Sequence, residues 1–200
     1  TTKPVTPPSS KRWTWAAWVK RGKTVASDPS YGGTGVLYQS GPDGSNYGST
    51  GMGRFMFNSG DLFMIEYYTP GAAGQVRRLM FNRSFADVSS WVHITITCDA
   101  LSGEGFKVYF NGVLETDVNQ DSLNPIVNRD FSFPINRTGE LMEIGNHGAK
   151  EYQFDGYLAD LQFIDGQAVT PDQLLTNSSA RQRQLIPAKY AGWYGTRGYR

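Results

Sequence analysis

The sequence has 200 residues, of which 39% are hydrophobic and 14% aromatic, and its formal net charge is +1. A chain of this length buries roughly 70% of its unfolded surface, so it can build a core without disulfides or a structural metal. The near-zero charge argues against nucleic acid or an anionic membrane as the main partner. No apolar run approaches the roughly 18 residues needed to span a bilayer.

Cys98 is the only cysteine, which excludes an intrachain disulfide. Secreted adhesion domains are often disulfide-bonded, so we expect this one to fold in a reducing cytoplasm. The thiol lies in an apolar stretch, where a buried and inert cysteine is the expected state. The sequence has no signal-peptide pattern and no initiator methionine, and we expect it to be a piece of a longer protein.

Residues 1–10 are rich in Pro, Ser and Thr and indicate a linker or an extended arm. Residues 13–20 (WTWAAWVK) alternate with period 2, which predicts a strand with Trp13 and Trp15 on one face and Trp18 on the other. Three tryptophans so close together could form a sugar-stacking platform. We favour packing in the core, because large aromatic side chains dominate core burial.

Short alternating segments separated by Gly, Asn and Asp follow along the chain, and they predict further strands. Asn111-Gly112 is the strongest hairpin signal, since both central residues of a type I′ turn need positive φ. We expect Asn119–Gly139 to be a long irregular connection. The predicted strands cover residues 36–40, 54–58, 62–68, 75–81, 91–99, 106–110, 113–116 and 141–145.

Two of these strands show clear inside-outside patterns. In residues 91–99 the side chains expected to face the core are Val92, Ile94, Ile96 and Cys98, and those expected to face outward are His93, Thr95 and Thr97. In the next strand the inward set is Phe106, Val108 and Phe110, and the outward set is Lys107 and Tyr109.

Residues 154–171 (FDGYLADLQFIDGQAVTP) predict a strand, a turn at Asp165-Gly166 and a short helix that begins at Thr170-Pro171. The apolar side chains expected on one face of this strand are Tyr157, Ala159, Leu161 and Phe163. In all we expect ten to twelve strands and one short helix, which predicts an all-β, two-sheet antiparallel jelly-roll sandwich. We divide the chain into an arm (1–10), the sandwich (11–176) and a C-terminal extension that leads to further chain (177–200).

The sequence offers little for catalysis or metal binding. His93 and His147 lie in no recognisable triad context, and two distant histidines with one cysteine give no zinc spacing. Sandwich glucanases place paired acids on one strand as Glu-x-Asp-x-Glu, whereas Glu140 and Glu143 would lie on opposite faces. We therefore expect no enzymatic activity and no cofactor, with a calcium ion at a loop rim left open.

The long loop over residues 41–53 (GPDGSNYGSTGMG) is the preferred candidate for a sugar site. Tyr47 offers a ring face for C–H contacts, and Asp43 and Asn46 offer hydrogen bonds to hydroxyls. His147 and Tyr152 are further candidates. An ordinary exposed β-loop has the same composition, and this alternative remains open.

Five segments together resemble a known family: WTWAAWVKRGK, SSWVHITITCDA, KVYFNGV, MEIGNHG and FDGYLADLQFIDGQAVTPDQL. In this order and spacing they are similar to the laminin-G-like, concanavalin A-like domains of bacteriophage tail-fibre and other virion-surface proteins. The resemblance spans residues 11–176 and implies a jelly-roll sandwich. The terminal LIPAKYAGWYGTRGY resembles a piece that usually follows this domain and leads into further chain.

The resemblance implies a function on a phage particle, although this fold hosts lectins, hydrolases and structural modules alike. We expect a non-enzymatic tail-fibre or spike domain that binds bacterial surface polysaccharide, assembled in the host cytoplasm as a homo-oligomer such as a trimer. The alternative is a structural capsid decoration or fibre-attachment domain that contacts other virion proteins. Its sign would be apolar patches on the sandwich surface.

Overall fold

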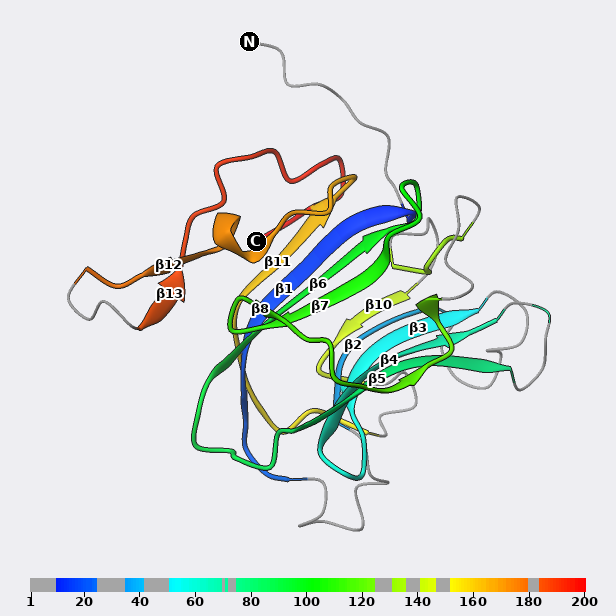
Figure 1. Cartoon of the computed structure of the whole chain (residues 1–200), viewed down its shortest axis with the longest axis horizontal. Helices are drawn as coiled ribbons and strands as arrows, with labels where there is room; N and C mark the ends of the chain where they lie inside the picture. Colours follow the sequence, from blue (N-terminus) through cyan, green and yellow to red (C-terminus); the bar gives the residue numbers. More distant parts are fainter. Residues whose placement is uncertain are drawn as a thin grey trace.

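The computed structural model describes residues 10–24, 35–41, 51–69, 71, 75–124, 131–135, 141–146, 152–179 and 184–200. Two antiparallel β-sheets lie face to face with an aromatic core between them (Figure 1). The predicted all-β, two-sheet sandwich is confirmed. In the described part of the chain, no helix is long and apolar enough to cross a membrane.

The first sheet has five strands in the order β11-β1-β6-β7-β8. Their bounds are β1 (Arg12–Arg21), β6 (Val92–Asp99), β7 (Gly105–Phe110), β8 (Val113–Leu114) and β11 (Gly156–Asp165). The turn between β7 and β8 is the predicted Asn111-Gly112 turn, and both residues have positive φ, 51° and 81°. The strongest local signal in the sequence therefore formed the expected hairpin.

The second sheet has six strands in the order β10-β2-β3-β4-β5-β9. Their bounds are β2 (Gly35–Gly41), β3 (Met52–Phe57), β4 (Leu62–Tyr68), β5 (Val76–Ser84), β9 (Val118–Asp121) and β10 (Leu141–Ile144). Strand β9 lies at the start of the connection that we expected to be irregular throughout, and that expectation was wrong there. All four β9 residues are exposed and only Val118 is apolar, so they carry no inside-outside pattern.

The predicted short helix is a single 3-10 turn, η4 (Pro171–Gln173). Thr170 is its N-cap residue and proline stands at its first position, as predicted, but the Thr170 side chain makes no capping hydrogen bond. A two-stranded sheet follows, formed by β12 (Leu175–Asn177) and β13 (Leu185–Pro187).

The core between the sheets is built around the first strand. Trp13 and Trp15 are fully buried, and the Trp15 ring lies 5.4 Å from the ring of Phe55 on the opposite sheet. Trp13 lies 5.6 Å from Phe133 and 5.8 Å from Phe106, also between ring centroids. Core packing is therefore the role of these two tryptophans, as the sequence favoured.

Strand β11 departs from its predicted alternation. Tyr157 and Ala159 are exposed, whereas Leu158, Leu161 and Phe163 pack on the core. The cause is a bulge, because the pairing with β1 shifts between Ala16 and Trp18, and Asp160 adopts φ = 48°. A bulge adds one residue, and one residue reverses which side chains face inward. The expectation that Tyr157 and Ala159 face the core was wrong for this reason.

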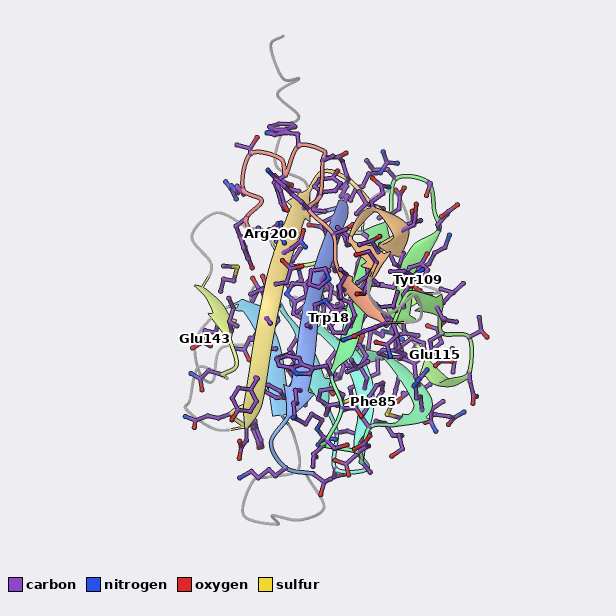
Figure 2. The ribbon with its side chains drawn as sticks, turned by 90° about the vertical axis from the view of Figure 1, so that its left-hand side faces the viewer. Trp18, Phe85, Tyr109, Glu115, Glu143 and Arg200 are labelled. Atoms are coloured by element: carbon purple, nitrogen blue, oxygen red, sulfur yellow. The ribbon has the colours of Figure 1, made fainter. Side chains whose placement is uncertain are left out.

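The C-terminal part of the chain covers the outer face of the five-stranded sheet, the face turned away from β2–β5 (Figure 1). Tyr190, Val169 and Leu174 pack there against Ala16 and Ile164. The face is also tied by hydrogen bonds, since the Thr14 hydroxyl donates to the Gln167 carbonyl at 2.9 Å and accepts from the Val169 N–H at 2.9 Å. Figure 2 looks onto this side of the molecule, with Trp18 near its centre.

His93, Thr95 and Thr97 point away from the core as predicted, yet all three are buried. The ring of Trp18 lies 5.2 Å from the His93 ring, between centroids, and the Thr95 hydroxyl lies 3.2 Å from His93 Nδ1. Burial lowers the pKa of His93 to about 4, against a small opposing effect of Asp160. His93 is therefore a neutral structural side chain at neutral pH.

Candidate functional site

A pocket of about 160 Å³ lies at the end of the sandwich where β1 and β5 end and β6 begins. Residues 85–91 form its wall as the chain crosses from the six-stranded to the five-stranded sheet (Figure 1). In Figure 2, Phe85 lies below Trp18 at this end of the molecule. Pockets for drug-sized ligands measure roughly 300–1,000 Å³, so this one suits a single small ring.

The inner wall of the pocket is held by Arg21, the last residue of β1. Its guanidinium donates to the Asp61 carboxylate at 2.6 Å and to the Phe85 carbonyl at 2.7 Å, and it lies 4.6 Å above the centre of the Phe57 ring. Arg21 is 5% exposed. A buried ion pair with these further contacts fixes the wall, so the pocket is formed before any ligand arrives.

Two exposed aromatic side chains lie together at the rim. Trp91, which lines the pocket, is 41% exposed, and Tyr157 on β11 is 64% exposed. Their ring centroids are 6.4 Å apart, with 50° between the planes. Of the large hydrophobic side chains exposed in the described part of the chain, only these two are aromatic. The electron-rich faces of aromatic rings suit contacts with the C–H groups of a sugar.

The polar groups of the pocket include a carboxylate and a carboxamide. Asp87 Oδ1 accepts hydrogen bonds from the Ser89 hydroxyl at 2.6 Å and the Ser89 N–H at 2.8 Å, and these bonds hold the pKa of Asp87 below its usual range. Asp87 is therefore ionised at neutral pH and can accept hydrogen bonds from hydroxyls. Asn111 Oδ1 accepts from the His93 N–H at 2.8 Å, so its amide NH₂ remains a donor.

A second polar region crosses the outer face of the six-stranded sheet. The pairing of strands places Glu143, Gln39, Arg54, Glu66 and Arg78 in one row. Glu66 accepts hydrogen bonds from the Nε atoms of both arginines at 2.6 Å. The two arginines and Glu66 therefore satisfy one another, and the row contributes a charged network to the sheet.

The carboxylates of this row do not form a glycosidase pair. Glu66 and Glu143 are three strand spacings apart, or roughly 14 Å. Retaining and inverting glycosidases need about 5–9.5 Å between their two carboxyl groups. The described residues also contain no group of three or more His, Cys, Asp or Glu side chains that could hold a metal ion.

Four of the five predicted sugar-binding residues, Asp43, Asn46, Tyr47 and His147, lie outside the described residues. The fifth, Tyr152, is half-buried beside Val36, Met56 and Met64, and its carbonyl accepts from the Val36 N–H at 3.0 Å. Tyr152 does not line the pocket. Of the predicted residues, only Tyr152 is described, and it lies away from the pocket. The role of the other four stays a prediction.

The pocket was not predicted from the sequence, because Trp91 carries only the local signal of the start of a strand. A polar segment, DVSS, directly precedes Trp91 and offered a local signal. No local signal could indicate that Tyr157 pairs with Trp91, because the bulge at Asp160 turns Tyr157 outward.

A model of the concanavalin A-like lectin/glucanases superfamily matches residues 1–174. A comparison with curated proteins finds no match. The fold is similar to the sialidase CBM40 module of Ruminococcus gnavus bound to α2,3-sialyllactose, with 14% identity, a TM-score of 0.56, and 82% of this chain and 80% of that chain covered.

Two further solved structures share the fold. A heptameric SAP-like pentraxin from Limulus polyphemus has 15% identity and a TM-score of 0.52, over 86% of this chain and 76% of that chain. The receptor-binding domain of botulinum neurotoxin type G has 15% identity and a TM-score of 0.51, over 81% of this chain and 36% of that chain. At these identities the likeness shows a common fold.

Proposed function

The chain belongs to the concanavalin A-like lectin/glucanases superfamily, and from this premise we propose that it is a non-enzymatic carbohydrate-binding module. One observation carries the proposal: exposed Trp91, which packs against exposed Tyr157, lines a preformed pocket that also holds polar side chains. The R. gnavus module, whose structure holds sialyllactose, shares this fold and supports sugar binding by such a sandwich. The predicted loop residues, Asp43, Asn46 and Tyr47, remain part of the proposal as a second contact region.

The proposed mechanism is binding of one sugar residue in the pocket. The ring of Trp91 covers the C–H face of the sugar, while Asp87 accepts from hydroxyls and Asn111 donates to them. A pocket of about 160 Å³ gives weak single-site affinity, since few atoms make contact. Several copies on one particle raise the avidity by roughly 100- to 10,000-fold, which is why an oligomer belongs to the proposal.

The setting that we propose is the surface of a bacteriophage particle, on a tail fibre or spike that contacts bacterial surface polysaccharide. The resemblance of five segments of the sequence to virion-surface domains supports this setting. The lone buried cysteine, Cys98, supports folding in a reducing host cytoplasm before assembly. No cofactor is needed by the proposed mechanism.

The test is binding to immobilised bacterial surface polysaccharides and a glycan array, with the protein displayed in several copies on beads. We expect saturable binding that Trp91→Ala weakens about 10-fold or more, as for a central contact residue. Trp193→Ala is the matched control, because it removes the same side chain from the C-terminal segment, outside the pocket. Absence of binding, or equal binding by Trp91→Ala, would overturn the proposal.

A structural role in the virion is the second candidate, and one observation favours it. Val113 and Leu114 on β8 and Val118 on β9 are exposed, by 68%, 43% and 38%. The two strands are edge strands of their sheets, and exposed apolar groups at strand edges suit contact with another protein. A Val113→Lys variant that assembles into particles normally would argue against this role.

A further inference from the structure

The charged group that distinguishes the pocket is Arg83, which lies near the end of β5 on the pocket wall. Its guanidinium carbon lies 5.8 Å from the centre of the Phe85 ring and 5.6 Å from that of Phe110. These two rings hold the flat cation from one side by cation–π attraction. Its side chain remains 48% exposed, so the group is positioned but accessible.

Arg83 has a carboxylate neighbour, Glu115, with which it forms a long ion pair but no hydrogen bond. Glu115 Oε2 lies 3.7 Å from the Arg83 guanidinium, which is longer than a hydrogen bond. The other oxygen of Glu115 accepts from the Thr116 and Asp117 N–H groups, each at 3.1 Å, so this side chain is held by its own loop. Within the part of the chain that the structure describes, Arg83 donates no hydrogen bond.

The two arginines of the pocket therefore differ in what they offer to a ligand. Arg21 donates to Asp61 and to the Phe85 carbonyl and is almost fully buried. Arg83 keeps its donors for water or a ligand. The planar guanidinium of an arginine matches a carboxylate through two parallel hydrogen bonds, which a lysine cannot form.

We infer that the pocket selects a sugar that carries a carboxylate, such as a uronic or sialic acid at the end of a glycan. The inference rests on the proposed carbohydrate-binding function and names the ligand class of the same site. The carboxylate of the sugar meets Arg83, its hydroxyls reach Asp87, and its ring lies at Trp91. Asp87, which is also ionised, disfavours a ligand with negative charge at both ends, so a single carboxylate fits best.

The experiment compares glycans that end in glucuronic, galacturonic or sialic acid with the same glycans after reduction of the carboxyl group to an alcohol. We expect the acid forms to bind about 10- to 100-fold more tightly than the reduced forms, as for a charge-assisted bidentate contact. Binding of the acid forms should weaken as salt rises, because the contact is partly exposed.

Three variants and one control variant make the test specific. Arg83→Gln should abolish the preference for acid forms, and Arg83→Lys should retain a small part of it. Glu115→Gln should strengthen binding of acid forms a few-fold, because it removes the competing charge while its amide oxygen can still accept from the loop N–H groups. Arg77→Gln is the matched control, since Arg77 lies six residues earlier on the same strand and face, roughly 20 Å away.

The outcomes separate this inference from the proposed function. Equal binding of acid and reduced glycans, with Trp91→Ala still weakening both, would overturn the acid preference and leave carbohydrate binding in place. Loss of the preference in Arg77→Gln as well as in Arg83→Gln would also overturn it. Failure of every glycan to bind would overturn both the acid preference and the proposed carbohydrate binding. Thermal unfolding of each variant confirms that a change in binding is not a change in folding.

Discussion

Tryptophans in two regions of this molecule differ in environment, and the difference separates folding from recognition. Trp13 and Trp15 lie between the sheets with no exposed surface, among rings that come from both sheets. Trp91 lies at the rim of a pocket, packs against Tyr157, and is 41% exposed to solvent. A ring that already buries its surface in the native state has none left for a ligand. The cluster of three tryptophans near the start of the sequence thus belongs mainly to the core, and the single tryptophan after a polar segment is the candidate for binding.

The largest expected effect is in the core. Trp15→Ala should lower the free energy of unfolding by about 4 kcal/mol, because it leaves a cavity where Tyr38 and Phe55 now contact the indole ring. Trp91→Ala should change it by about 0.5 kcal/mol or less, as for other exposed positions. Denaturant unfolding of both variants measures the contrast, and equal losses would contradict the division between core and rim.

The next effect concerns the wall of the pocket. Asp61→Asn should lower stability by about 3 kcal/mol, because it leaves the buried Arg21 cation without its ionised partner. Asparagine tolerates the positive φ of this position, 59°, so the change isolates the charge. Urea unfolding checks the value. Adding Arg21→Met should recover part of the loss, and a further loss in the double variant would show that the pair is not the cause.

The smallest of the three effects is a pH dependence of stability from His93. Its folded pKa of about 4 lies below the ordinary value of about 6.5, so below pH 6.5 the unfolded chain takes up a proton that the folded protein does not. The contribution of neutral His93 to the free energy of unfolding is therefore complete above pH 6.5, and it declines as the pH falls. The stability difference between the native protein and His93→Gln should therefore shift by about 2 kcal/mol between pH 7 and pH 5. A difference that stays constant would contradict this assignment.

Much of the fold could be predicted from the sequence because its signals are local. Alternation identified the inward side chains of β6, and Asn111-Gly112 identified the turn between β7 and β8. Strand β9 was missed because its exposed residues do not alternate. The two halves of β11 were assigned to one face because a single bulge residue, Asp160, leaves no mark in the hydrophobic pattern.

The candidate site was harder to predict because it depends on tertiary contacts. The pocket joins residues from β1, β5 and β6 with the crossing segment 85–91, and its rim adds Tyr157 from much later in the chain. His93 and Thr95 are likewise buried on the outer face of the five-stranded sheet, and the C-terminal segment covers this face (Figure 1). The alternation of the strand indicated that these side chains face outward, and it could not indicate what lies over them.

Contact between Trp91 and a sugar can be followed by tryptophan fluorescence during a titration with a glycan that binds. The native protein should show a saturable change in emission and lower access of acrylamide to the exposed indole. Trp91→Phe, which keeps an aromatic ring but removes this indole, should lose the change while the buried Trp13 and Trp15 continue to emit. If Trp91→Phe shows the same change as the native protein, the sugar binds elsewhere and the account is wrong.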